Sequence, residues 1–233
     1  MFDQSAEFYD ALYSWKDYPT EAGRLHEIIE SRAPSAATLL DVACGTGQHL
    51  EHLRAWYSVE GVDVEPSLLE VARERLPGVP LHMGDMRYFN LGRQFDVITC
   101  LFSSIGYMQT PVDLLHALVN MTGHLTDDGV LIVEPWLSPD GFDPDHMPRA
   151  LVAEGPDFMV VRTNDSRVEG RLSIMNFHYL VGRPGTVEHF VETHAPALYT
   201  PDEYRAAFEA AGLMPTLDDA GLMGRGLWIA QRA

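Results

Sequence analysis

The chain has 233 residues, of which 46% are hydrophobic and 21% are charged, and this composition excludes a disordered protein. Its formal net charge is −18, from 34 acidic and 16 basic residues, and a field of that sign disfavours nucleic acid as a partner. No apolar run has the length of a transmembrane helix and the N-terminus lacks the features of a signal peptide, so we expect a cytoplasmic protein without a membrane partner.

The length permits one domain, residues 1–233, that carries an elaborated insertion. Cys44 and Cys100 both lie in apolar segments, and we expect reduced packing residues rather than a disulfide. The ten histidines are scattered without the spacing of a metal site, so the sequence predicts no metal ion.

The N-terminal residues 2–32 are predicted to be helical, with an interruption at residues 14–19. Pro19 disfavours helix at Tyr18, and we expect the second helix to run from Thr20 to Arg32. Apolar and aromatic side chains recur on one side of the first helix, at Phe2, Ala6, Tyr9, Leu12 and Tyr13. Tyrosines in such an element indicate either a lid over a pocket or core packing.

A glycine turn follows the first predicted strand. Gly45 and Gly47 carry no Cβ and adopt positive φ readily, so the backbone can turn sharply and let a bulky ligand lie directly against it. The same two glycines can instead serve only the close packing of a strand on a helix.

Two carboxylates point to the kind of ligand. Asp41 precedes the turn, where its charge would attract an ammonium group, such as that of the aminoacyl end of S-adenosylmethionine. Asp63 ends the next strand, close to the spacing at which an acidic residue binds a ribose.

Strands and helices alternate from residue 38 to residue 135, which predicts a parallel sheet that binds ligands at the carboxyl ends of its strands. The expected strands are residues 38–43, 58–63, 79–83, 95–101 and 129–135. The expected helices are residues 48–55, 65–76 and 111–124.

The chain changes character after a loop at residues 137–150. Segments that resemble antiparallel strands are residues 151–153, 158–168, 171–181 and 187–197. We expect this meander, an insertion at about residues 150–198, to cover the substrate pocket and to offer a surface for a homodimer.

The last segment is predicted to complete the sheet. Thr200 caps a helix that ends at Ala211, and strands are expected at residues 213–218 and 227–231. The expected fold is therefore α/β and Rossmann-like, with a seven-stranded, mostly parallel sheet that has one antiparallel edge.

The stretch from Leu39 to Leu50, together with Asp63, resembles the first motif of the class I S-adenosylmethionine-dependent methyltransferases. Dinucleotide binding is disfavoured because Leu50 replaces the third glycine of that fingerprint. The resemblance implies S-adenosyl-L-methionine as cofactor, adenine contacts from Asp85 and Met86, and an N-terminal cap at residues 1–32. Asp85 can also cap a short helix. The cofactor-binding residues that we predict are Tyr13, Tyr18, Asp41, Ala43, Gly45, Gly47, Asp63, Val64, Asp85, Met86 and Leu101.

A closer resemblance extends over nearly the whole chain, to the bacterial N,N-dimethyltransferases of TDP-linked deoxyaminosugars, of the desosamine and mycaminose type. The segments that carry it include Phe8-Tyr9-Asp10, Lys16-Asp17-Tyr18, Gly84-Asp85-Met86-Arg87, Phe102-Ser103-Ser104-Ile105-Gly106, Val133-Glu134-Pro135-Trp136, Val187-Glu188-His189 and Gly224-Arg225-Gly226. The resemblance implies double methylation of a sugar nitrogen in antibiotic biosynthesis. This chain has Tyr107 where those enzymes have histidine, which leaves the identity of the acceptor open.

A substrate ammonium must lose a proton before its nitrogen can attack, and Tyr107, Glu134 and His178 are candidate acceptors. Each has an alternative role: Tyr107 as pocket wall, Glu134 as a structural or cofactor-lid partner, and His178 as an exposed strand residue. Arg162 and Arg225 are candidates for a diphosphate, because guanidinium pairs bidentately with phosphate oxygens. The substrate-binding residues that we predict are Tyr9, Ser103, Ser104, Trp136, Arg162 and Arg225.

Three other functions are compatible with these features. The acceptor can be another small-molecule amine, phenol or polyketide hydroxyl, or the chain can bind the cofactor without catalysis. A nicotinamide-dependent oxidoreductase is compatible on grounds of fold alone.

Overall fold

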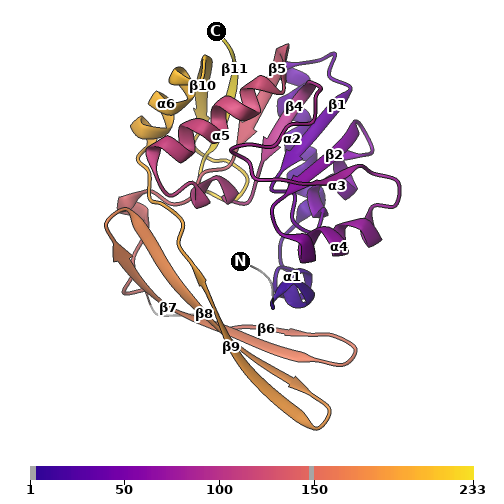
Figure 1. The fold of residues 1–233 in the computed structure, drawn as a ribbon, viewed down its shortest axis with the longest axis vertical. Helices are drawn as coiled ribbons and strands as arrows, with labels where there is room; N and C mark the ends of the chain where they lie inside the picture. Colours follow the sequence, from indigo (N-terminus) through magenta and orange to yellow (C-terminus); the bar gives the residue numbers. More distant parts are fainter. Residues whose placement is uncertain (1–3, 147–149) are drawn as a thin grey trace.

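The computed structural model describes residues 4–146 and 150–233, and it contains two separate β-sheets. Figure 1 shows a seven-stranded sheet with helices on both faces in the upper part of the molecule, and a four-stranded sheet below it. The expected start of the first helix at residue 2, with Phe2, lies outside the described residues.

The seven-stranded sheet has the strand order β10-β11-β5-β4-β1-β2-β3. Its strands are β1 (Thr38–Val42), β2 (Ser58–Asp63), β3 (Leu81–Met83), β4 (Phe95–Cys100), β5 (Leu125–Val133), β10 (Leu213–Asp218) and β11 (Leu227–Arg232). Strand β11 runs antiparallel to both of its neighbours, so the antiparallel strand lies next to the edge strand β10 and not at the edge itself. The mostly parallel sheet predicted from the sequence is confirmed. Its order reverses between β1 and β4, and the carboxyl ends of these strands flank the crevice in which such sheets bind ligands.

Helices cover both faces of this sheet, as Figure 1 shows. They are α2 (Tyr18–Arg32), α3 (Gln48–Leu53), α4 (Pro66–Arg75), α5 (Pro111–Gly123) and α6 (Pro201–Ala210). Side chains of α2, α3 and α4 share one buried cluster with Leu39, Val97 and Ile132, whereas those of α5 and α6 pack with Leu40, Ile98 and Leu131 on the other face. Neighbouring strand residues therefore enter opposite core layers, which explains the nearly continuous apolar runs of the central strands.

The helix boundaries follow local capping signals. Thr200 and Glu203 form a capping box at the start of α6, and the Thr110 side chain accepts a hydrogen bond from Asp113 N at the start of α5. Helix α2 begins at Tyr18, two residues earlier than expected. The Asp17 side chain caps it by accepting from Thr20 N, and this places Pro19 in the first turn, where proline is tolerated.

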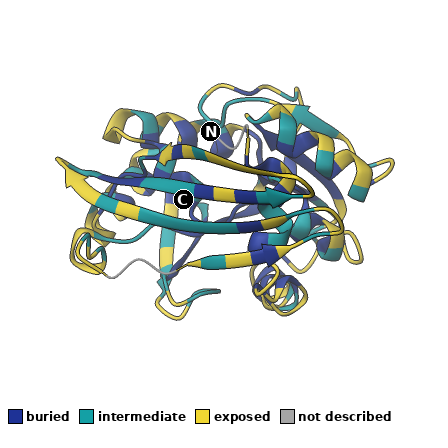
Figure 2. Ribbon diagram, turned by 90° about the horizontal axis from the view of Figure 1, so that it is seen from below, coloured by how far each residue is buried: buried dark blue, intermediate teal, exposed yellow. Residues whose placement is uncertain are grey.

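The four-stranded sheet is antiparallel, in the order β6-β7-β8-β9. Its strands are β6 (Leu151–Glu154), β7 (Met159–Glu169), β8 (Leu172–Arg183) and β9 (Thr186–His194). Helix α1 (Ala6–Leu12) packs Phe8 and Leu12 against Val160 and Tyr179 on the face turned toward the larger sheet. Tyr179 and Val181 are buried whereas Leu180 between them is 49% exposed, so one face of this sheet is covered and the other is open. Figure 2 shows buried, intermediate and exposed stretches along its strands.

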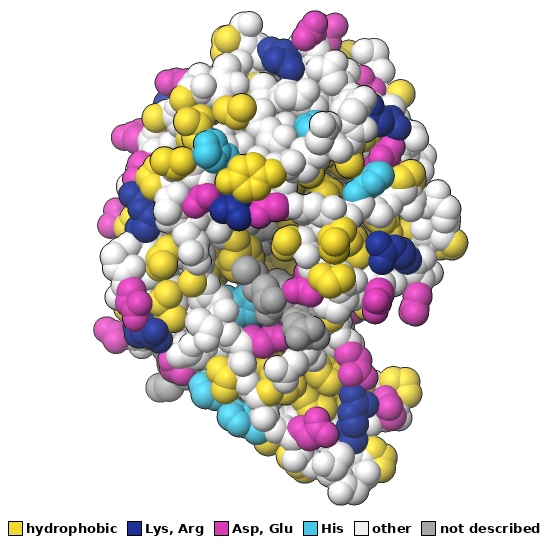
Figure 3. Space-filling view, in the orientation of Figure 1, with side chains coloured by type: hydrophobic (Ala, Val, Ile, Leu, Met, Phe, Trp, Pro, Cys, Tyr) yellow, Lys and Arg dark blue, Asp and Glu magenta, His cyan; other side chains and the backbone are white. Residues whose placement is uncertain are grey.

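None of the described helices is both long and apolar enough to cross a membrane. On the face in Figure 3 the basic side chains stand singly and beside acidic ones. The thiols of Cys44 and Cys100 are both free and buried.

Candidate functional site

Three cavities lie over the carboxyl ends of β1, β2 and β4, and all three share the side chains Tyr9 and Ser104. The first cavity is also lined by Ala43, Gly45, Asp63, Val64, Glu65, Leu68, Gly84, Asp85, Met86, Arg87, Tyr107 and Met108. The second is also lined by Tyr18, Asp41, Ala43, Cys44, Gly45, Thr46, Gln48, His49, Leu101 and Phe102. The third is also lined by Tyr13, Trp15, Phe102, Ser103, Tyr107, Trp136, Leu151, Arg162, Met175, Phe177, Pro196 and Arg225. The three cavities therefore adjoin at these two side chains, and together they form the cleft over this edge of the sheet.

Most of the predicted site residues line this cleft. Nine of the eleven residues predicted to bind the cofactor line the first or second cavity, and all six predicted to bind substrate line the third. Tyr13 differs, because it lies in the third cavity with the predicted substrate residues. Gly47 lines none of the three. A Cβ at Gly47 would stand 2.6 Å from Leu76 Cδ1, so this glycine permits the turn to pack against the end of α4.

The glycine turn presents an open backbone to the first two cavities. Gly45 has a φ of +55°, and a Cβ built there would meet no atom within 4 Å. Its N–H donates to Asp63 Oδ2 at 2.8 Å, which ties the turn to the end of β2. A flat ligand can therefore lie against Gly45 without displacing a side chain.

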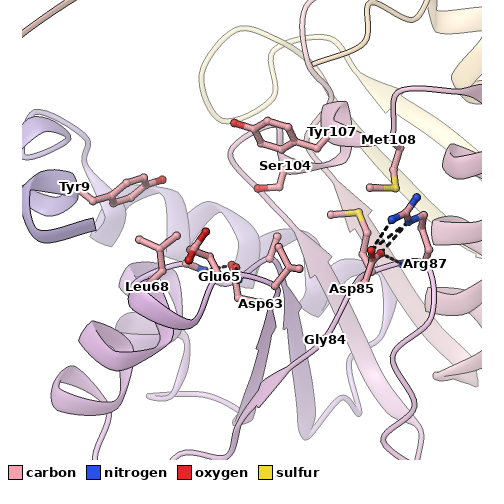
Figure 4. Close-up of a pocket in the computed structure, with 14 residues that line it drawn as sticks. Tyr9, Asp63, Glu65, Leu68, Gly84, Asp85, Arg87, Ser104, Tyr107 and Met108 are labelled. Carbon is pink, nitrogen blue, oxygen red and sulfur yellow. Dashed lines mark hydrogen bonds and ion pairs between the residues drawn. The ribbon is translucent and has the colours of Figure 1, made fainter. Parts of the chain in front are cut away.

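Two carboxylates follow β2 along the wall of the first cavity. Asp63 is buried and also accepts from Glu65 N at 2.8 Å, and burial raises the pKa of its carboxyl. Figure 4 shows Glu65 directed into the same cavity beside Asp63, at the start of α4. Sequence reasoning identified Asp63 but missed Glu65, which lies two residues beyond the strand end. Both carboxylates are acceptors for paired hydroxyl groups.

Asp85 lies toward the opposite end of the first cavity and is paired with Arg87. Its Oδ2 accepts from Arg87 Nη2 at 2.7 Å, and hydrogen bonds from the Arg87 side chain lower the pKa of this carboxyl. Met86 and Met108 add apolar surface there. This end therefore combines an ionised acceptor with apolar covering (Figure 4).

The second cavity contains one deeply buried carboxylate, Asp41. Thr99 Oγ1 donates to Asp41 Oδ1 at 2.7 Å. Burial raises the pKa of Asp41 to about 7, the neighbouring Asp63 adds to this increase, and the hydrogen bond from Thr99 opposes it. Asp41 thus sits at the end of β1 as an acceptor that a cationic ligand group would ionise.

A buried cluster of charges lies behind the second cavity. Both carboxylate oxygens of Glu21 accept from Lys16 Nζ, and Glu21 Oε2 lies 2.8 Å from His49 Nε2. Burial lowers the pKa of His49, so the imidazole that lines the cavity is neutral at physiological pH. Sequence reasoning missed this cluster, although Lys16 belongs to one of the segments that carry the family resemblance.

The turn after β4 is held in an uncommon backbone conformation. Phe102 and Ser103 have φ values of 51° and 63°, and Ala43 at the end of β1 has 60°. These are the positive values among non-glycine residues that the structure describes, and all three residues line the cleft. Such strain persists where the surrounding contacts fix it, and here Glu134 Oε2 accepts from Phe102 N at 2.7 Å.

This contact corrects the interpretation of Glu134 as a proton acceptor for substrate. The side chain is fully buried, burial raises the pKa of its carboxyl, and Glu134 does not line any of the three cavities. It points into the protein from the end of β5 and holds the turn that presents Ser103 and Ser104.

Two arginines face the third cavity from different parts of the chain. Arg225 Nη1 donates to Ser103 Oγ at 3.0 Å, and its guanidinium lies over the Trp136 ring. Arg162 Nη1 donates to Tyr13 Oη at 2.8 Å and lies over the Phe177 ring. Aromatic and hydroxyl contacts hold both guanidinium groups at the wall of the third cavity, and their binding of a diphosphate stays a prediction.

His178 lies on the other face of the four-stranded sheet. Its neighbour Phe177 lines the third cavity, and successive side chains of a strand point to opposite faces. His178 Nε2 is 3.0 Å from Asp165 Oδ2 and about two fifths of its side chain is exposed. His178 is therefore not a proton acceptor for a ligand in the cleft.

Tyr107, the remaining candidate, lines both the first and the third cavity. Its hydroxyl lies 2.7 Å from Nδ1 of His194, a buried residue at the end of β9. The contact joins residues 87 positions apart, and no local motif pointed to it.

The N-terminal helix is fastened to the glycine turn. Thr46 Oγ1 donates to Asp10 Oδ1 at 2.7 Å, and Arg75 Nη2 is 2.5 Å from Asp10 Oδ2. Arg75 also donates to the carbonyl of Thr46. Asp10 belongs to a segment that carries the family resemblance, and that was the available signal for this contact.

The comparisons with known proteins agree on one kind of protein. A family model described as "Methyltransferase domain" matches residues 39–129. The chain is 42% identical to a dTDP-4-amino-2,3,4,6-tetradeoxy-D-glucose N,N-dimethyltransferase of Saccharopolyspora spinosa, over 97% of this chain and 92% of that protein. It is also 42% identical to a dTDP-3-amino-3,6-dideoxy-alpha-D-glucopyranose N,N-dimethyltransferase of Streptomyces fradiae, over 96% of this chain and 89% of that protein.

Two solved structures are similar over nearly the whole chain. The crystal structure of Streptomyces venezuelae DesVI matches with a TM-score of 0.92 and 40% identity, covering 99% of each chain. The structure of CalS10 with bound S-adenosylmethionine, an amino pentose methyltransferase from Micromonospora echinaspora involved in calicheamicin biosynthesis, matches with a TM-score of 0.84 and 39% identity. That match covers 94% of this chain and 92% of CalS10.

Proposed function

The chain belongs to the TDP-aminosugar N,N-dimethyltransferases, a family that uses S-adenosylmethionine, and we propose that it methylates the amino nitrogen of a TDP-linked deoxyaminosugar twice. The observation that carries this proposal is that the three cavities adjoin at Tyr9 and Ser104, with carboxylates lining the first two and two arginines lining the third. Relatives of this kind act in antibiotic biosynthesis, and we propose the same setting here.

The first two cavities suit S-adenosylmethionine, which supplies an activated methyl group when bound. Asp85 and Met86 are placed for the adenine, Asp63 and Glu65 for the ribose hydroxyls, and Asp41 for the ammonium group. The open backbone at Gly45 leaves room for the ligand between these groups. Tyr18, Ala43, Val64 and Leu101 line the remaining surface.

The third cavity suits the nucleotide sugar. In this proposal Arg162 and Arg225 pair with phosphate oxygens, because guanidinium groups suit phosphate geometry, and Tyr9, Ser103, Ser104 and Trp136 contact the sugar. All six residues line the cavity, which supports the assignment. A reacting nitrogen held about 3 to 3.5 Å from the methyl carbon, in line with its bond to sulfur, accounts for much of the rate in such a transfer. The protein therefore contributes chiefly orientation, with Tyr107 as the catalytic residue for proton removal.

The position of the amino group is not assigned by similarity. The substrates named for the relatives from Saccharopolyspora spinosa and Streptomyces fradiae carry the amino group at C4 and at C3, yet both enzymes are 42% identical to this chain. Acceptor assays must therefore include both 3-amino and 4-amino sugars.

We propose that the whole chain is one methyltransferase domain, with residues 1–32 as a cap and about residues 150–198 as a cover. The shared packing of α1 with the four-stranded sheet supports this arrangement. A nucleotide sugar and S-adenosylmethionine are intracellular metabolites, which supports a cytoplasmic location.

We further propose a homodimer through the outer face of the four-stranded sheet. Val152, Val161 and Leu180 lie side by side on three strands of that face, and Met159 and Val191 extend the apolar surface. Exposed side chains in a contiguous apolar patch favour association, and a second copy offers the same patch in a two-fold arrangement.

Calorimetry and mass spectrometry test the proposed activity. We expect S-adenosylhomocysteine and TDP each to bind in the absence of the other, and we expect mono- and dimethylated products when TDP-3-aminosugars or TDP-4-aminosugars are supplied with cofactor. Arg225→Ala should raise the KM for the nucleotide sugar about tenfold or more while leaving the affinity for S-adenosylhomocysteine unchanged. Methylation of a phenol or hydroxyl acceptor instead, or unchanged kinetics in Arg225→Ala, would refute the assignment.

A further inference from the structure

Tyr107 lies where the cofactor and acceptor cavities meet. It lines both, and Figure 4 shows its hydroxyl above Ser104, directed toward the side of the cavity on which Tyr9 lies. Burial raises the pKa of the Tyr107 phenol well above its ordinary value, so the side chain keeps its own proton at physiological pH. By itself, this phenol cannot store a second proton.

A buried imidazole stands directly behind the phenol. Tyr107 Oη is 2.7 Å from His194 Nδ1, and only 1% of the His194 side chain is exposed. Phe177 packs against the same imidazole, with ring centroids 4.9 Å apart. The phenol O–H donates to Nδ1 when the proton of the imidazole resides on Nε2.

Glu192 completes the arrangement on the far side of the imidazole. Its Oε2 lies 3.9 Å from His194 Nε2 and accepts from Ser5 Oγ at 2.6 Å, while Oε1 accepts from Ser5 N at 3.1 Å. Burial alone would raise the pKa of Glu192, but the neighbouring His194 and hydrogen bonds from Ser5 and the backbone lower it. An ionised carboxylate thus stabilises an imidazolium at His194.

We propose that Tyr107, His194 and Glu192 form a proton relay that deprotonates the substrate ammonium before each methyl transfer. This inference rests on the proposed function. The ammonium gives its proton to Tyr107 Oη while the phenolic proton moves to His194 Nδ1, so the phenol remains neutral and His194 becomes imidazolium beside Glu192. The freed nitrogen lone pair then forms the N–C bond as the C–S bond breaks, with that electron pair remaining on sulfur.

The relay is needed twice because the first product is again an ammonium. After the first transfer the secondary nitrogen carries a positive charge and cannot attack until it loses a proton. His194 must therefore return its proton to solvent between the two rounds, and the same three residues serve both.

The groups that act electrostatically on Tyr107 come from four parts of the chain. They are Tyr13 from the N-terminal segment, Arg162 from β7, Tyr179 from β8 and Glu192 from β9. Tyrosine, arginine and glutamate side chains ordinarily keep one charge state between about pH 6 and pH 9, whereas histidine changes its charge in that range. Other groups that titrate near neutrality, such as Asp41, are the same in the wild type and in a His194 variant, so a difference between the two pH profiles reports on His194.

The test is the single-turnover rate of methyl transfer between about pH 6 and pH 9.5, at saturating TDP-aminosugar and S-adenosylmethionine. We expect His194→Gln to be at least about tenfold slower than the wild type near pH 7 and to recover by about tenfold per pH unit as the amine loses its proton to solvent. Tyr107→Phe should show the same profile, and the double variant should be no slower than either. His116→Gln, an exposed histidine on α5, is the matched control and should follow the wild type.

Imidazole NMR gives a second readout that does not depend on turnover. In the complex with S-adenosylhomocysteine, adding the TDP-aminosugar should move the ring ¹⁵N signals of His194 toward imidazolium, and Tyr107→Phe should abolish that shift. Profiles of His194→Gln that parallel the wild type, or an equal loss of rate at every pH, would overturn the relay. A wild-type protein that methylates no amine at all would instead overturn the proposed function, and the relay with it.

Discussion

Asp41 combines burial, one hydrogen bond from Thr99 and a position at the end of β1, and together these make its charge state sensitive to a ligand. The sequence alone indicated a carboxylate for an ammonium group, because a phosphate site would not place a negative charge there. In the structure, burial raises the pKa of Asp41 to about 7, and the charge of this carboxyl therefore depends on pH near neutrality.

Binding of S-adenosylhomocysteine should weaken as the pH falls below 7. The ligand ammonium favours ionised Asp41, so below the pKa of the free protein, about 7, binding must release a proton. We expect the affinity to be roughly tenfold lower at about pH 6 than at about pH 8, and to level off above neutrality. Calorimetry in buffers of different ionisation enthalpy measures both the affinity and the proton release.

Asp41→Asn should bind more weakly and without this pH dependence, which separates Asp41 from Asp63, whose pKa burial also raises. Asp127→Asn is the control, because Asp127 is almost fully exposed on β5. Parallel affinity curves for Asp41→Asn and the wild type would mean that another group responds to the cofactor.

At the scale of elements, α1 is the connection between the two halves of the site. Phe8 and Leu12 pack on the four-stranded sheet, while Asp10 on the same helix contacts Thr46 and Arg75 next to the glycine turn. Helix α1 therefore touches the four-stranded sheet beside the third cavity and the glycine turn beside the first two cavities at once.

Asp10→Ala should weaken the binding of S-adenosylhomocysteine about fivefold, which corresponds to about 1 kcal/mol for a partly exposed ion pair and one hydrogen bond. In this variant, helix α1 should also exchange its amide hydrogens faster, because the contacts of Asp10 with Thr46 and Arg75 are lost. Hydrogen exchange of residues 5–13 and calorimetry measure the two effects.

Glu7→Ala is the matched control for this helix. Glu7 pairs with Arg183 of β8 and does not touch the glycine turn, so its loss should leave cofactor affinity unchanged. Equal effects of the two substitutions on affinity would show that α1 acts through its general stability and not through Asp10.

The sequence predicted the elements of the α/β body well because their signals are local. Apolar runs, glycine turns and helix caps each act within a few residues, and parallel strands bring their carboxyl ends together at one edge. That edge contains Asp41, Asp63 and Asp85 as expected. Strand β5 begins at Leu125 and not at residue 129, because Leu125 already pairs with Phe95 in the core. A register shift before Val130 leaves Asp127 and Asp128 exposed between the two paired parts.

The four-stranded sheet was less predictable from the sequence. Alternation of apolar and polar residues identifies the two faces of a strand but not which of them faces the cleft. Arg162 pairs with Tyr179 and Thr163 pairs with His178, so Arg162 and His178 lie on opposite faces of the sheet. Both were predicted to act on the substrate, and only Arg162 lines the cleft. The contact between Tyr107 and His194 depends on how two distant segments meet, which no local pattern encodes.

For the whole molecule, the four-stranded sheet presents one face to the cleft and leaves the other open. Leu180 is 49% exposed at the centre of that open face, next to Val161 and His189 on the neighbouring strands. A charge at this position would have to be desolvated in a face-to-face dimer.

Leu180→Asp should therefore convert a dimer into a monomer at micromolar concentration, as measured by sedimentation velocity. Val119→Asp is the control, since Val119 is similarly exposed, at 48%, but lies on α5. A wild-type protein that sediments as a monomer, or a Leu180→Asp variant that remains dimeric, would exclude this face as the interface.

Because α1 contacts both the four-stranded sheet and the glycine turn, we expect the cofactor and the nucleotide sugar to act as heterotropic effectors of one another. Because one helix contacts both the glycine turn and the cover, any ligand that steadies its position reduces the ordering cost for the second. Linkage requires this effect to be reciprocal, so the nucleotide sugar raises the affinity for the cofactor by the same factor as the cofactor raises the affinity for the sugar. We therefore expect release of the spent cofactor between the two rounds to loosen the hold on the monomethylated sugar, and the second methylation to proceed as a separate, distributive encounter.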